Sequence, residues 1–251
     1  MIRQFLLLFL MVPLFLGDDD SDKAYAKYRE GELASNALNR KQAFNEALTM
    51  YLHMETDRPS AVLCLNIANT YYQLNEYGYA ILYYYKALKE NPRLDEAKTN
   101  LQIALNKVGM SADTPNFVQN YLLFLHYKLS HNEKALTVLL LLFAAFALLS
   151  VHLWLPQAVL KKVACIALWV ALVFFTSIIW ADYFTLPEAV VIRPVALRRD
   201  AGDQYAPVVG TPVLPGTKLQ VLSIGADGNW LKVRSKTSED GYISKEYARI
   251  I

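Results

Sequence analysis

Two apolar stretches, ALTVLLLLFAAFALLSVHLWL at residues 135–155 and VACIALWVALVFFTSIIWA at residues 163–181, decide how the rest of this chain is organised. Neither stretch contains Asp, Glu, Lys or Arg. About 20 helical residues, at about 1.5 Å each, cross the ~30 Å hydrocarbon core of a bilayer. No polar stripe recurs at helical spacing, as it would on a core helix of a soluble protein. Both stretches are therefore predicted to be transmembrane helices.

The ends of the two stretches fit this prediction. Ser130 and Glu133 stand three apart before the first stretch and are expected to form a capping box. Aromatic residues mark the ends, as in the interfacial belts of membrane proteins: Trp154, Trp180, Tyr183 and Phe184. Small residues are expected to let the two helices pack closely: Ala144, Ala147, Ala167 and Ala171.

The connection between the stretches is short, Pro156 to Lys162. Because backbone groups must pair within the bilayer, residues 135–184 are predicted to form an antiparallel helical hairpin. The parts before and after the hairpin would then share one side of the membrane. Lys161 and Lys162, with no acid beside them, place the connection in the cytoplasm by the positive-inside rule, so both soluble parts are expected to face outward.

The N-terminus points to the same orientation. Arg3 is followed by an apolar run, Phe5 to Leu16, which is short for a membrane span but has the length of a secretory signal. Residues 1–17 are therefore predicted to be a signal peptide or an uncleaved signal anchor. Either form exports the part that follows.

Residues 21–108 show an internal period near 34 residues, which is typical of paired-helix repeats. With Ala61 as the first position of a unit, residues fall where a tetratricopeptide repeat places them: Cys64, Ile67, Ala68, Tyr71, Ala80, Tyr84, Ala87 and Pro92. A degenerate earlier unit carries Ala47, Tyr51 and Pro59, and Leu94 to Lys107 is expected to be a closing helix. The sequence thus predicts an α-helical tetratricopeptide array, with an unrelated helical bundle as the alternative.

The concave face of such an array binds extended or helical peptides. In this register the groove is expected to be lined by Val62, Leu65, Asn66, Asn69, Tyr72, Thr99, Asn100 and Ile103. Asn66 and Asn100 would hydrogen-bond a bound backbone or, equally, bond between helices. Residues 109–134 form an amphipathic linker that either lies on the bilayer surface or packs as a helix against the array.

From residue 190 to residue 251 the pattern changes to short alternating runs broken by Gly, Pro and Asp. Strands are expected at residues 190–192, 218–224, 230–234 and 241–243, which together predict a compact β-barrel. The order of the Gly216 turn, the Trp230 strand and the Gly241–Tyr242 pair resembles bacterial SH3-like domains. Trp230 and Tyr242 would form an aromatic wall for a peptide or cell-wall ligand, unless Trp230 plugs the barrel instead.

The order of signal, tetratricopeptide array, membrane hairpin and SH3-like tail resembles the BatE family of the bacterial aerotolerance (Bat) operons. Residues that carry the resemblance are Asn66, Tyr71, Ala80, Tyr84, Ala87, Pro92, the stretch Phe117 to Glu133, Trp230, Gly241 and Tyr242. The resemblance implies membrane-anchored von Willebrand factor A proteins and a MoxR-type ATPase as partners. It also implies a role in envelope integrity or oxidative-stress tolerance. With the outward orientation expected from the loop charge and the signal, the predicted location is the bacterial inner membrane, with the soluble domains in the periplasm.

No enzymatic, metal or cofactor function is expected. The four histidines are scattered without metal-ligand spacing, and a net charge of +2 with mixed signs gives no basic stripe for nucleic acid. Cys64 and Cys165 lie in different parts of the chain, so no disulfide is expected. Two functions remain open: a membrane-anchored adaptor that holds partner proteins, and an envelope sensor whose tail binds peptidoglycan. A transport component would need buried charges in the apolar helices, and they have none.

Overall fold

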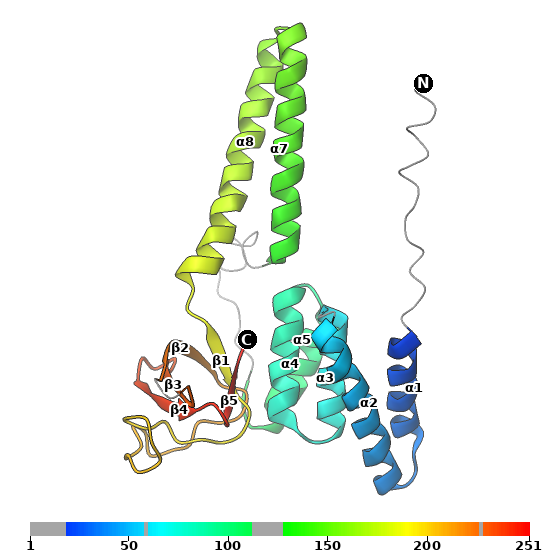
Figure 1. Cartoon of the computed structure of the whole chain (residues 1–251), viewed down its shortest axis with the longest axis vertical. Helices are drawn as coiled ribbons and strands as arrows, with labels where there is room; N and C mark the ends of the chain where they lie inside the picture. The colour runs from blue at the N-terminus through cyan, green and yellow to red at the C-terminus, as the bar shows by residue number, and fades with distance from the viewer. Residues whose placement is uncertain (1–18, 58–59, 112–127, 226–227) are drawn as a thin grey trace. The chain divides into compact units, whose positions relative to one another are not determined.

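The structure is a computed structural model that describes residues 19–57, 60–111, 128–225 and 228–251 (Figure 1). Seven α-helices, one π-helical turn and five strands lie in these ranges. The chain divides into two compact units, Met1–Pro59 and Ser60–Ile251. The predicted signal at residues 1–17 and most of the predicted linker at residues 109–134 lie outside the described residues.

The first unit contains a pair of packed helices, α1 (Asp19–Leu33) and α2 (Ala37–Asp57). Phe44 of α2 is buried, and its ring lies 5.3 Å from that of Tyr28. Gly31 makes room for Phe44, because a Cβ there would lie 2.8 Å from the Phe44 ring. Burial also raises the pKa of Tyr51 to about 12. The packed aromatic rings therefore fix how the two helices meet.

The second unit begins with α3 (Ala61–Gln73), α4 (Tyr77–Glu90) and α5 (Asp95–Lys107). The Ser60 hydroxyl caps α3 by accepting from the Leu63 backbone N–H, and α4 ends just before Pro92, which cannot continue a helix. The small and aromatic positions expected between helices are buried: Cys64, Ile67, Ala68, Ala80, Tyr84 and Ala87. Tyr71 is half-buried and stacks on Tyr79 and Tyr83, with ring centroids 5.0 Å and 5.6 Å away.

The two apolar stretches form α7 (His131–Trp154) and α8 (Ala158–Ile179), which lie side by side (Figure 1). Both are long and apolar enough to cross a membrane. The Ser130–Glu133 capping box is present as predicted. A π-helical turn, η2 (Trp180–Phe184), follows α8. The connection is shorter than expected, because α8 begins at Ala158 and takes Lys161 and Lys162 into its first turns.

The interface between α7 and α8 uses small side chains, though not all the expected ones. Ala171 is buried as predicted, together with Ala145, Ala164 and Phe174. Ala144 is exposed, so the prediction for this residue was wrong by one position. Most apolar side chains of the two helices remain at least partly exposed: only 6% of the most apolar window of α7 and 17% of that of α8 are buried. Such exposure does not fit a pair of core helices in a soluble protein.

The tail forms one antiparallel sheet in the order β4-β3-β2-β1-β5. Its strands are β1 (Glu188–Val191), β2 (Lys218–Ile224), β3 (Trp230–Arg234), β4 (Asp240–Ser244) and β5 (Ala248–Ile250). The four predicted strand positions are confirmed. The predicted barrel is not closed, because β4 and β5 remain the two edges of the sheet over the described residues.

One face of this sheet holds the apolar core of the tail. The core residues alternate along the strands and are joined by Leu197 from the segment after β1: Ala189, Val191, Leu197, Leu219, Val221, Leu231, Val233, Ile243 and Ala248. Val190 is also fully buried, although it points to the opposite face, and β1 is the strand that contacts α4. β1 is therefore buried on both faces.

Glycines allow this close approach between helix and sheet within the second unit. A Cβ on Gly78 of α4 would lie 1.9 Å from the Ile192 carbonyl oxygen. A Cβ on Gly216, whose φ is +90°, would lie 2.9 Å from Ile81 and 3.0 Å from Leu105. Beside them the Lys218 ammonium lies 4.2 Å from the centre of the Tyr85 ring, at cation–π distance.

We expect Gly78→Ala to destabilise the protein by about 1–3 kcal/mol, since the new methyl group would overlap backbone rather than a flexible side chain. Gly210→Ala is the matched control, because a Cβ there meets nothing within 4 Å. Thermal unfolding of the purified proteins measures the difference. Equal unfolding midpoints for the two variants would contradict the close packing of α4 on the sheet.

Candidate binding surfaces

The predicted groove residues divide into exposed and internally bonded groups. Val62 and Ile103 are 60% and 44% exposed, Thr99 is also exposed, and Leu65 is buried. Tyr72 is half-buried, with its ring 5.3 Å from that of Tyr77. The exposed members of the predicted groove thus include two large aliphatic side chains, Val62 on α3 and Ile103 on α5.

Asn100 bonds between helices, which was one of the two uses expected for Asn66 and Asn100, and its partner is Asn69. The Asn100 amide donates to Asn69 Oδ1 at 2.9 Å, and the Tyr84 hydroxyl donates to the same oxygen at 2.7 Å. One asparagine therefore joins α3, α4 and α5. The side-chain oxygen of Asn69 accepts both hydrogen bonds, so this residue holds the three helices together.

Asn66 is the exception among these asparagines. Its backbone carbonyl accepts from the Thr70 hydroxyl, but its side-chain amide makes no hydrogen bond within the described ranges. Val62, Asn66 and Asn69 follow the i, i+4, i+7 spacing of one helix face. Asn66 therefore offers a donor and an acceptor between the exposed Val62 and the bonded Asn69.

In the tail, Trp230 does not plug a barrel. The burial of β3 alternates, with Leu231 and Val233 inside and Trp230 on the outer face, where it is half-buried. Trp230 pairs with Ser244, and Lys232 pairs with Tyr242, so Trp230 and Tyr242 share this outer face on diagonal positions. Of the two alternatives for Trp230, the structure agrees with an aromatic wall formed by Trp230 and Tyr242 outside the core, and not with a plug inside a barrel.

Trp230 also lines a pocket of about 150 Å³ that the sequence did not predict. The other lining residues come from the irregular segment after β1 and from the region of β4 and its turn: Pro194, Val195, Ala196, Arg198, Asp203, Ser244 and Tyr247. Isolated bridges such as Arg198 with Tyr242 hold the irregular segment against the sheet. These bridges join residues far apart in the chain, and residues 193–217 lack the alternation that reveals a strand.

An ion pair stands on the same outer face. Arg234 donates to both carboxylate oxygens of Asp240, at 2.6 Å and 2.9 Å. The hydrogen bond from Arg234 lowers the pKa of the Asp240 carboxyl. The pair lies at the turn end of the β3–β4 hairpin, where the two residues are register partners.

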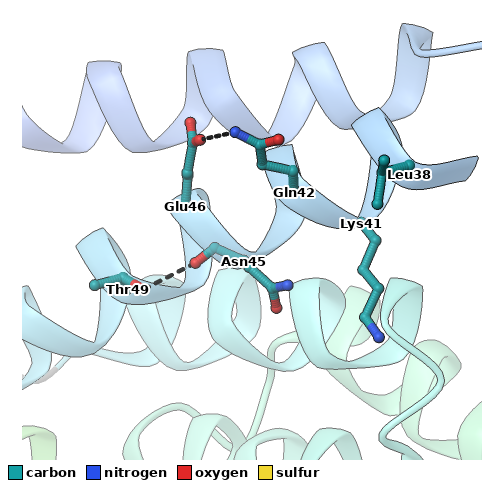
Figure 2. A pocket seen from close by; sticks show the side chains of 6 residues that line it. All are labelled: Leu38, Lys41, Gln42, Asn45, Glu46 and Thr49. Atoms are coloured by element: carbon teal, nitrogen blue, oxygen red, sulfur yellow. Dashed lines mark hydrogen bonds between the residues drawn. The ribbon is translucent and has the colours of Figure 1, made fainter. Parts of the chain in front are cut away.

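A second hollow lies along helix α2 of the first unit. It measures about 470 Å³ and is lined by residues of α2: Leu38, Lys41, Gln42, Asn45, Glu46 and Thr49 (Figure 2). Two of the lining side chains are bonded: Gln42 donates to Glu46 at 3.0 Å, and Lys27 pairs with Glu46 at 2.9 Å. The Lys27 ammonium also lowers the pKa of Glu46. The Glu46 carboxylate in this hollow is therefore already paired with a cation.

Neither a metal cluster nor a disulfide is found in the described part of the chain. No group of three His, Cys, Asp or Glu side chains there could hold a metal ion. Cys64 is buried in α3 and Cys165 is exposed on α8, and neither is in a disulfide.

Comparisons with protein-family models, curated proteins and solved structures find no match to this chain.

We expect Asn69→Ala to cost about 1–3 kcal/mol of stability, because both donors on its oxygen lose their acceptor. Tyr84→Phe removes one donor and leaves the Asn69–Asn100 bond, so its cost should be smaller, about 0.5–1.5 kcal/mol. Urea unfolding of both variants measures the two losses. If Asn69→Ala were no more costly than Tyr84→Phe, the shared-acceptor role would be wrong.

The Asp240 pair predicts a dependence of stability on pH. Because the pKa of Asp240 is lowered in the folded protein, its contribution is complete above the ordinary value of 3.8 and is lost as the pH falls through the lowered value. The stability difference between wild type and Asp240→Asn should therefore shrink as the pH falls below 3.8. Thermal unfolding across pH 2–6 tests this, and a constant difference would count against the pair.

Proposed function

We propose that the chain is a non-enzymatic, membrane-anchored adaptor in which α7 and α8 span the bilayer as a hairpin and the helical part binds partner proteins. The anchor is supported by the large apolar surface that α7 and α8 leave uncovered. Exposed aromatic residues at the ends of the helices, Trp154, Trp180 and Tyr183, suit the two interfaces of a membrane.

The observation that carries the binding role is on the outer part of α3. The Asn66 side-chain amide, beside the exposed Val62, makes no hydrogen bond to any described residue. An amide can donate to and accept from the backbone of an extended peptide at once. Val62 and Ile103 supply apolar surface, which contributes about 25 cal/mol for each Å² that a ligand covers. The face is thus suited to a peptide segment with apolar side chains.

In this proposal α3 and α4 form one tetratricopeptide unit, α5 closes the array, and the tail is an SH3-like domain with an open sheet. The burial of Ala68, Ala80 and Ala87 supports the repeat, since these positions require small side chains where two helices meet. The resemblance to BatE proteins suggests the partners, von Willebrand factor A membrane proteins and a MoxR-type ATPase system. It also suggests a role in envelope integrity or oxidative-stress tolerance.

A shared membrane raises the effectiveness of such an adaptor. Two proteins held in one bilayer meet at a raised effective concentration, so a weak groove suffices to keep them together. Lys161 and Lys162 beside the connection favour a cytoplasmic turn, which would place both soluble parts in the periplasm at the inner membrane.

A second candidate function is a peptidoglycan-binding envelope sensor that acts through the tail. The half-buried, outward position of Trp230 and Tyr242 favours it, because two aromatic rings on one sheet face suit a flat ligand. Sedimentation of the full-length protein with purified cell wall separates the two functions, since the adaptor does not need the wall.

The adaptor is tested by crosslinked capture of partners on full-length, tagged protein from cells. Asn66→Ala should weaken capture roughly fivefold, which corresponds to about 1 kcal/mol for one lost hydrogen bond. Val62→Glu should weaken it further by charging the apolar face. The matched control is Asn39→Ala, an exposed asparagine on α2. Capture of the same proteins at wild-type yield by Asn66→Ala and Val62→Glu would refute the proposal.

A further inference from the structure

The pocket beside Trp230 has three walls of different chemistry. Trp230 and Tyr247 contribute aromatic surface, Pro194, Val195 and Ala196 contribute aliphatic surface, and Arg198 contributes a cation. Its volume of about 150 Å³ equals roughly that of five waters in the liquid, at ~30 Å³ each. A small charged group with a methyl-sized neighbour fits such a space.

The backbone of Arg198 is held in place from both sides. Arg198 and Tyr242 exchange two backbone hydrogen bonds, of 2.9 Å and 2.8 Å, and the adjacent Leu197 is buried in the core of the tail. Gly241 permits this approach, since a Cβ there would lie 2.5 Å from Leu197 Cγ and 2.8 Å from the Arg198 carbonyl oxygen. The cation is therefore carried on a rigid segment.

The Arg198 guanidinium is itself oriented but only loosely neutralised. Its Nη1 donates to the Tyr205 carbonyl oxygen at 2.9 Å, and its side chain is 27% exposed. The facing carboxylate, Asp203 Oδ1, lies 3.8 Å from Nη2, and the Asp203 side chain is 87% exposed. A separated pair this open to solvent adds little stability, whereas a bidentate arginine–carboxylate pair is short and strong.

We propose that this pocket binds the C-terminal carboxylate of a short peptide that ends in a small apolar residue, and that Asp203 is a built-in competitor for Arg198. The ligand carboxylate pairs with Arg198 in place of Asp203, which turns into solvent. The small terminal side chain then rests against Trp230 and the aliphatic wall. This site is separate from the α3 face and does not depend on the proposed adaptor function.

The test is isothermal titration of the full-length protein in detergent with N-acetyl-trialanine, which carries a free carboxylate, and with its C-terminal amide. We expect the acid to bind at least tenfold more tightly than the amide. Asp203→Asn should tighten binding of the acid about fivefold by removing the competitor. Arg198→Gln and Trp230→Ala should each abolish or strongly weaken it.

Asp200→Asn is the matched control, because Asp200 lies on the same segment but bonds to the Ala201 backbone N–H instead of Arg198. A general effect of charge would tighten binding equally in both aspartate variants. Such equality would overturn the proposal, as would equal affinity for acid and amide or unchanged affinity in Asp203→Asn. Asp203 is exposed, so this variant tests the site even if Arg198→Gln fails to fold.

Discussion

The uncovered apolar surface of α7 and α8 is the constraint on which the rest of the proposed organisation depends. Water would penalise this surface by about 25 cal/mol for each Å² exposed. The pair buries only a narrow apolar seam of its own, at Ala145, Ala164, Ala171 and Phe174. A bilayer removes the penalty while the helices satisfy their own backbone. Only Leu155 to Gln157 lie between the two helices. In the proposed organisation the chain therefore returns to the side of the membrane from which it entered.

Glycines set the contacts within the soluble part of the second unit. Gly78 admits the Ile192 carbonyl, Gly216 fits over Ile81 and Leu105, and Gly241 admits Leu197. Each position joins segments that lie far apart in the chain. Since close backbone approach leaves no space for a Cβ, the sheet and the helices α4 and α5 are matched to one another. A binding surface on the sheet is therefore supported by the helices α4 and α5, and a binding surface on these helices is supported by the sheet.

Local patterns were enough to predict most elements. The apolar runs, the Ser130–Glu133 box and the four strand positions all follow from neighbours in sequence, and the structure has them. The alternation of β3 also predicts that Trp230 lies on the outer face, because the apolar residues Leu231 and Val233 lie on the inner face. The barrel prediction failed because closure depends on which strands become edges. That is decided by long-range pairing such as β1 with β5.

Details of the candidate sites needed three-dimensional contacts. The seam residue is Ala145 and not Ala144, since helical periodicity gives spacing but not the rotation against a partner. Asn66 and Asn69 carry the same side chain one turn apart, yet only Asn69 meets Tyr84 and Asn100. Arg198 is held beside its pocket by a backbone bridge to Tyr242, which lies 44 positions later in the chain.

Labelling of single cysteines tests the hairpin most directly. In a background with Cys64 and Cys165 replaced by Ala, cysteine is placed at the exposed positions Asn39, Gln157 or Thr211. A membrane-impermeant maleimide is then added to intact spheroplasts. The account predicts that Asn39→Cys and Thr211→Cys are labelled and that Gln157→Cys is labelled only after lysis. Labelling of Asn39→Cys and Thr211→Cys on opposite sides of the membrane would contradict it.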